Sequence, residues 1–161
     1  GNLYNSCLKR LSIIGNMTVA GLTASSFLYG ALATGITLPD KVILFFVIAF
    51  LANIGREIVK GIRDLEGDTR VGICTLPCEI GVDKAGIVAA VFMAMAVALS
   101  FAAVNYFTLK YLFMILILVT DAIFLHSIYL MVKEPTISSA ARVRKTTLIG
   151  MLLAIISFVL P

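Results

Sequence analysis

The sequence predicts an all-α protein, a multi-span bundle of about five transmembrane helices. Of its 161 residues, 60% are hydrophobic and only 14% are charged, whereas about a quarter of the residues in soluble domains are charged. The apolar residues gather in runs of about 20, the length that a helix needs to cross a bilayer. A net charge of only +4 beside such runs excludes a disordered chain and a soluble nucleic-acid-binding protein.

Five stretches form the predicted spans of a single membrane domain, 1–161. They are 11–33, 41–62, 85–107, 111–132 and 146–160. The first contains small residues such as Gly15, Gly21 and Gly30, which allow helices to pack closely in lipid. The fourth contains two ionisable residues. We expect Asp121 to face the bundle interior as a structural or protonated carboxyl group, and His126 to be buried and hydrogen-bonded.

The basic residues predict how the chain is oriented in the membrane. Eleven of the thirteen lysines and arginines fall on one side of the five spans, and only Lys41 and Lys110 fall on the other. Loops with an excess of lysine and arginine stay in the cytoplasm. We therefore expect a multi-pass protein of the cell membrane whose polar segment after the second span faces the cytoplasm.

A polar stripe at the end of the second span is predicted to carry the chemistry. At about 100° per residue, its members share an arc of about 80° on one helix face. They are Asn53, Glu57, Lys60, Asp64 and Asp68. Such a stripe on a membrane helix should face a water-filled cavity rather than lipid. The alternative, which the sequence leaves open, is a solvated helix end held by ion pairs between neighbouring turns.

The spacing of two carboxylates within this stripe suggests a magnesium site. Asp64 and Asp68 lie one helical turn apart, so both side chains point the same way. Mg²⁺ is typically bound by one or two carboxylates together with substrate phosphates. Basic residues nearby are suited to binding the same phosphate oxygens, and these are Arg56, Lys60, Arg63 and Arg70. We therefore predict Asp64 and Asp68 as catalytic, metal-binding residues.

The cysteines are expected to be reduced thiols. There are three in the chain, an odd and sparse set that indicates no disulfide framework. Cys74 and Cys78 have no second pair of ligands nearby, which makes a zinc site improbable.

The run from Arg56 to Gly81 resembles the second aspartate-rich region of the UbiA superfamily of intramembrane prenyltransferases. The matching segments are Arg56-Glu-Ile-Val-Lys60, Asp64-Leu-Glu-Gly-Asp68 and Thr75-Leu-Pro77. Within the superfamily the pattern is most similar to the archaeal branch that makes ether lipids. The resemblance covers nearly the whole chain but only the carboxyl half of the nine-helix fold of that family. Gly61 stands where the family often has a further aspartate.

The first motif of the family, N-D-x-x-D-x-x-x-D, is absent from these residues. We therefore expect that amino-terminal helices of the same fold are missing and that this chain alone is an inactive fragment. The resemblance further implies that Lys9 reaches the diphosphate of a substrate and that Asn16 lies near the active cavity, and Asn53 is the first residue of the polar stripe. With the four basic residues named above, these three are the expected substrate-binding residues.

The activity implied by the resemblance is a Mg²⁺-dependent transfer of a geranylgeranyl group. The donor would be its diphosphate and the acceptor geranylgeranylglyceryl phosphate, in the synthesis of archaeal-type ether lipids. The expected partners are these two substrates and membrane lipid, without nucleic acid. Two alternatives stay open. One is an aromatic or tetrapyrrole acceptor, and the other is a non-enzymatic scaffold or transport subunit whose polar stripe lines a permeation path.

Overall fold

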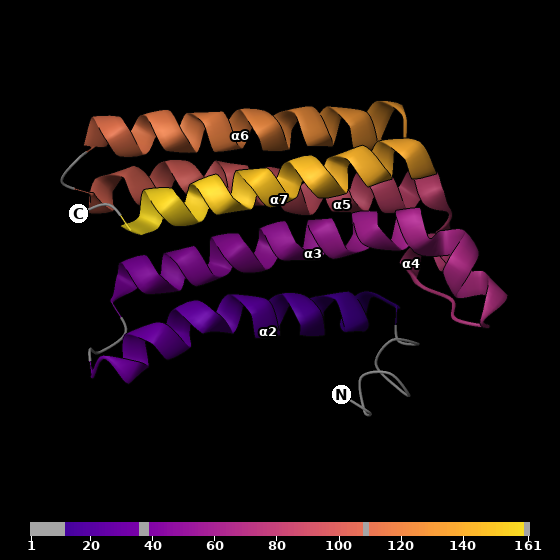
Figure 1. Cartoon of the computed structure of the whole chain (residues 1–161), viewed down its shortest axis with the longest axis horizontal. Helices are drawn as coiled ribbons and strands as arrows, with labels where there is room; N and C mark the ends of the chain where they lie inside the picture. The colour runs from indigo at the N-terminus through magenta and orange to yellow at the C-terminus, as the bar shows by residue number, and fades with distance from the viewer. Residues whose placement is uncertain (1–11, 36–38, 108–109, 160–161) are drawn as a thin grey trace.

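The computed structural model of the chain describes residues 12–35, 39–107 and 110–159. These residues form helices joined by short turns, without a strand, which confirms the predicted all-α class. The helices are α2 (Ser12–Ala33), α3 (Asp40–Arg70), α4 (Leu76–Ile80), α5 (Val82–Ala103), the 3₁₀ helix η2 (Val104–Tyr106), α6 (Lys110–Lys133) and α7 (Ile137–Val159). The long helices run roughly side by side (Figure 1).

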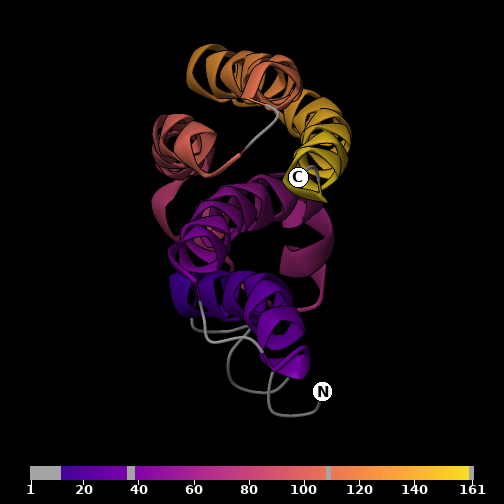
Figure 2. The same ribbon diagram turned by 90° about the vertical axis from the view of Figure 1, so that its left-hand side faces the viewer.

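Helix α3 occupies the centre of the bundle. It packs against α2 on one side and against α5 and α7 on the other, and α6 packs against both α5 and α7. The helices α3, α5, α6 and α7 therefore form a ring of four, seen end-on in Figure 2, with α2 outside the ring beside α3. This arrangement places the second predicted span, which carries the polar stripe, in contact with most of the other helices.

Three helical stretches in the described part of the chain are long and apolar enough to cross a membrane. They are Asp40–Arg70, Val82–Tyr106 and Tyr111–Lys133, and they cover the second, third and fourth predicted spans. Helices α2 and α7 cover the first and fifth predicted spans, whose membrane crossing stays a prediction.

Two helix boundaries differ from the predicted spans. Helix α3 continues from the predicted limit at 62 to Arg70, so the two aspartates of the stripe lie on its last turns. Helix α7 begins at Ile137 rather than at 146, because the hydroxyl of Thr136 accepts a 3.1 Å hydrogen bond from the backbone N–H of Ser139. Such a cap stabilises the start of a helix. Apolar runs mark the part of a helix in lipid and miss its polar turns.

Glycines allow α5 to lie close to both of its neighbours. A Cβ atom on Gly55 of α3 would lie 2.9 Å from the carbonyl oxygen of Ala89, and one on Gly86 of α5 would lie 2.5 Å from the carbonyl oxygen of Met131. Small residues at such contacts let helix backbones approach, which is how helices associate in lipid.

Aromatic side chains fill the interior of the bundle at the end where α3 begins. Phe45 stacks on Phe158 of α7, with ring centroids 3.9 Å apart. Phe107 stacks on Phe113 of α6 at the same centroid distance, and Phe27 of α2 meets Phe158 edge to face. We refer to these five residues as the aromatic end of the bundle.

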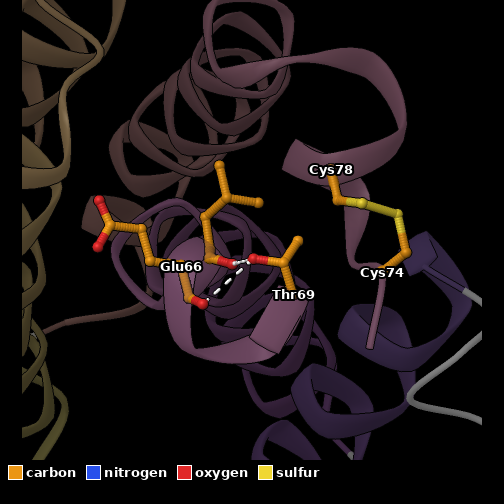
Figure 3. The surroundings of a disulfide bond; sticks show 5 residues. Glu66, Thr69, Cys74 and Cys78 are labelled. Carbon is orange, nitrogen blue, oxygen red and sulfur yellow. Dashed lines mark hydrogen bonds between the residues drawn. A yellow bond between two sulfur atoms is a disulfide. The ribbon is translucent and has the colours of Figure 1, made fainter. Parts of the chain in front are cut away.

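The expectation of reduced thiols at Cys74 and Cys78 is wrong, because a disulfide joins the two residues (Figure 3). Cys74 directly precedes Thr75, the N-cap residue of α4, and Cys78 lies within α4. The two Cα atoms are 5.3 Å apart, within the range that a disulfide requires. The bond therefore ties the last part of the connection after α3 to α4.

Candidate functional site

A cavity of about 480 Å³ is lined by all four helices of the ring and by α2. We call it the inner cavity. Its walls are mostly apolar, and they include Phe27 and Phe158 of the aromatic end. Helix α3 contributes two polar residues of the predicted stripe region to its wall, Asn53 and Arg56, and α6 contributes Asp121. A cavity of this size and composition is typical of a site for a largely apolar ligand.

A second cavity of about 420 Å³ lies at the other end of α3. We call it the end pocket. Its lining residues all come from the last turns of α3, and they are Arg63, Asp64, Glu66, Gly67, Asp68 and Arg70. The two aspartates predicted to bind metal therefore border one pocket, as expected for residues one helical turn apart.

An arginine holds the first of these aspartates. The Nε and Nη2 groups of Arg63 each donate a 2.7 Å hydrogen bond to Asp64, one to each carboxylate oxygen. These hydrogen bonds lower the pKa of Asp64, and the positive charges of Lys60 and Arg144 add to that effect, whereas burial opposes it. Asp64, which lies beyond the predicted limit of the second span, is therefore a carboxylate at neutral pH, the form that binds a metal ion.

Ion pairs also occur within the stripe, as the alternative interpretation proposed. The carboxylate of Glu57, whose side chain is 9% exposed, lies 3.1 Å from Nζ of Lys60 and 3.8 Å from Nη1 of Arg56. Arg56 also has a buried Nε group without a hydrogen-bond partner in the described residues. The stripe thus combines local ion pairs with groups that border the two cavities.

The other predicted site residues are distributed as follows. Asn53 is buried and its side-chain amide donates a 2.9 Å hydrogen bond to the carbonyl of Ala49. Arg70 is exposed at the end pocket. Asn16 is half-buried on α2 and is not among the residues that line these two cavities. Lys9 lies outside the described residues.

A buried polar pair borders the inner cavity far from the aspartates of the end pocket. The hydroxyl of Ser100 on α5 donates a 2.7 Å hydrogen bond to Oδ2 of Asp121 on α6, and both residues are buried and line the cavity. The interior location of Asp121 agrees with the expectation. Sequence reasoning missed Ser100, although it is the only serine or threonine in the third predicted span.

The expectation for His126 is wrong, because its side chain is exposed. Helix α6 packs through a face that contains Phe113, Ile117, Asp121 and Phe124. At about 100° per residue, His126 lies about 140° from Asp121 around the helix and faces outward.

The end pocket fits a magnesium ion that a substrate helps to bind. In the described ranges no group of three or more histidine, cysteine, aspartate or glutamate side chains is arranged to hold a metal. Asp64 and Asp68 supply two carboxylates at one pocket. Mg²⁺ is commonly bound by one or two carboxylates, with phosphate oxygens and water completing its coordination.

Comparisons with known proteins agree with this geometry. Residues 2–156 match the UbiA prenyltransferase family. The digeranylgeranylglyceryl phosphate synthase of Methanosphaera stadtmanae is 36% identical over 156 residues, which are 97% of this chain and 57% of that protein. The synthase of Pyrococcus abyssi is 39% identical over 160 residues, 98% of this chain and 55% of that protein.

A solved structure concerned with digeranylgeranylglyceryl phosphate synthase in membranes superposes with a TM-score of 0.82 at 32% identity. The superposition covers 97% of this chain and 55% of the solved chain. This chain therefore spans about half the length of the curated relatives that it matches. From the match along 2–156 and the shared fold, we conclude that the chain belongs to the UbiA prenyltransferase family.

Proposed function

We propose that this chain carries part of the active site of a membrane prenyltransferase. Its reaction would transfer a geranylgeranyl group from geranylgeranyl diphosphate to the free hydroxyl of geranylgeranylglyceryl phosphate. The relatives named above support this choice of donor and acceptor. The chemistry would take place at the cytoplasmic face of the cell membrane, an orientation that the excess of basic residues on the side of the end pocket supports.

One observation carries the proposal: a single helix borders a charged pocket and an apolar cavity in succession. Asp64 and Asp68 lie at the end pocket, and Arg56 lies at the inner cavity. Eight residues separate Arg56 from Asp64, which corresponds to about 12 Å along a helix. A ligand with an anionic head and a long apolar chain matches this order of environments.

The residues of α3 would bind the head of the donor. Asp64 and Asp68 would hold Mg²⁺, which neutralises negative charge on a leaving diphosphate when it is bound. Arg63 orients the Asp64 carboxylate through two hydrogen bonds. Arg56 adds fixed positive charge at the inner cavity and Lys60 adds it near Asp64, which favours the developing charge of the leaving group.

The inner cavity would hold the prenyl chain and keep water away from the allylic carbon. Its apolar wall favours burial of a hydrocarbon chain, and the aromatic end limits how far such a chain extends. In the reaction, the bond from the allylic carbon to the diphosphate breaks. A bond to the acceptor oxygen forms, and the proton of the acceptor hydroxyl is transferred to the departing diphosphate. Excluding water prevents hydrolysis of the donor.

We further propose that helices outside these residues complete the site. The support is the length of the relatives, of which this chain covers 57% and 55%. A second set of carboxylates would bring further Mg²⁺ to the diphosphate, because one pair offsets only part of its charge. This chain by itself would therefore be inactive in transfer.

The test removes charge at the end pocket in the full-length protein that the natural gene encodes. We expect Asp64→Asn and Asp68→Asn each to lower transfer of labelled geranylgeranyl groups strongly. Thermal stability should change little, since partly exposed ion pairs contribute about 0–1 kcal/mol. Asp40→Asn is the matched control, because Asp40 is exposed at the opposite end of α3.

Activity of Asp64→Asn and Asp68→Asn within about threefold of the parent at saturating Mg²⁺ would contradict both assignments. Transfer without Mg²⁺ would contradict the metal site, and an absence of any transfer would favour the scaffold alternative.

A further inference from the structure

Arg144 lies on the face of α7 whose side chains line the inner cavity. Leu148, Met151 and Ile155 line the cavity, and they follow Arg144 at spacings of four, seven and eleven residues. Residues at these spacings share one face of a helix. Arg144 is therefore the first member of this row, on the side nearer to the start of α7.

Arg144 also lies toward the same end of the bundle as Asp64. Helices α3 and α7 pack together and run in opposite directions, so the last turns of α3 lie beside the first turns of α7 (Figure 1). Asp64 precedes the last residue of α3 by six residues, and Arg144 follows the first residue of α7 by seven. Each residue is thus about 10 Å from the end of its own helix, on the side where these two helix ends meet.

The guanidinium of Arg144 has an unused donor inside the protein. Its Nε group is buried and has no hydrogen-bond acceptor within the described part of the chain, as is also true of Arg56 on α3. A buried donor without a partner is costly, and nearly all such groups in proteins are satisfied. Two arginines on facing helices that share this feature indicate a position for an anion between the inner cavity and the end pocket.

We propose that Arg144 is a phosphate-binding residue of this site, acting from α7 opposite the basic residues of α3. The inference rests on the proposed function and adds to it a residue that sequence analysis counted only as a cytoplasmic charge. Arginine binds phosphate oxygens through charge-assisted, often paired hydrogen bonds. The phosphate could belong to either substrate, the diphosphate of the prenyl donor or the phosphate of the prenylglycerol acceptor.

Equilibrium binding of ligands to the full-length protein in lipid nanodiscs, with Mg²⁺ present, tests this inference. The ligands are geranylgeranyl diphosphate, geranylgeranylglyceryl phosphate and the uncharged alcohol geranylgeraniol. The variants are Arg144→Met, which keeps an apolar stem without the charge, and Arg144→Lys, which keeps the charge without the paired donors. Arg142→Met is the matched control, because Arg142 is an exposed arginine on the same helix.

We expect Arg144→Met to weaken binding of at least one phosphate-bearing ligand about tenfold or more, as loss of a charge-assisted hydrogen bond does. Arg144→Lys should recover part of the loss, and geranylgeraniol binding should not change. A loss for the diphosphate alone assigns Arg144 to the donor, and a loss for the glycerol phosphate alone assigns it to the acceptor. Arg142→Met should bind all ligands as the parent does.

Two results would overturn the inference while leaving the proposed function intact. One is parent-like binding of both phosphate ligands by Arg144→Met. The other is an equal loss for geranylgeraniol, which would show that the arginine only supports the fold. If the parent binds neither phosphate ligand, the proposed function fails as well, so the two failures are distinguishable.

Discussion

The contact between α3 and α5 positions the polar stripe, and Gly55→Ala should disturb it measurably. Gly55 precedes Arg56 and is buried against α5. The added Cβ atom would lie 2.8 Å from Cγ of Met93 and 2.9 Å from the carbonyl oxygen of Ala89. Met93 is fully buried, so it has little room to move, and the backbone oxygen moves only if the helix moves.

The magnitude follows from two opposing effects. Overpacking of a filled interior costs about 1–3 kcal/mol, whereas replacing a helical glycine by alanine gains about 1 kcal/mol. Gly30→Ala provides the matched control, because Gly30 lies on α2 and a Cβ atom added there would meet no neighbouring group of the described chain within 4 Å. The difference between the two variants therefore isolates the cost of overpacking, about 1–3 kcal/mol.

Thermal unfolding of both variants in the same detergent measures this difference. For chains of this size, 1 kcal/mol corresponds to about 2–4 °C in Tm, so Gly55→Ala should unfold about 2–12 °C below Gly30→Ala. Binding of geranylgeranyl diphosphate should weaken in Gly55→Ala as well, since a displaced α3 alters the wall that contains Arg56. Equal Tm values for the two alanine variants would refute the close approach of α3 and α5.

Two further predictions concern the two ends of the proposed ligand. Lys60→Met should weaken binding of geranylgeranyl diphosphate with little change for geranylgeranylglyceryl phosphate, because it removes a cation beside the end pocket; an effect confined to the acceptor KM would reverse the assignment. Phe158→Ala should shift the ratio of kcat/KM toward geranylfarnesyl diphosphate, one isoprene unit longer than the proposed donor, because Phe158 lines the inner cavity and stacks on Phe45 at the aromatic end. An unchanged ratio with normal folding would show that the aromatic end does not limit the chain.

Local patterns in the sequence predict the features that depend on one helix. The apolar runs predict the long helices, since each run must be buried in lipid or protein. The spacing of Asp64 and Asp68 predicts that they share a pocket, because helix geometry alone fixes their relative direction. Burial of Ile54 and Ile58 opposite the stripe follows from the same periodicity.

Local sequence patterns do not predict contacts between helices that are far apart in the chain. Ser100 and Asp121 are 21 residues apart and meet only because α5 packs against α6. Arg144 appears in the sequence as one of several basic residues in a loop region, and its place beside α3 depends on the packing of α7. Cys74 and Cys78 lie where the chain enters the short helix α4, in a segment without an apolar period, so their disulfide had no sequence signal beyond the spacing.

The most direct test of the central claim locates the prenyl chain of a bound donor. A geranylgeranyl diphosphate analogue with a photoreactive group on its terminal isoprene unit would be cross-linked to the protein in nanodiscs with Mg²⁺, and the labelled residues identified by mass spectrometry. We predict labelling at the aromatic end, at Phe27 or Phe158, that excess unlabelled donor prevents and Asp64→Asn reduces. Labelling of the outward surface instead, for example at Tyr29 or Tyr111, which are 75% and 86% exposed, and unaffected by competitor, would contradict the claim that the inner cavity holds the donor.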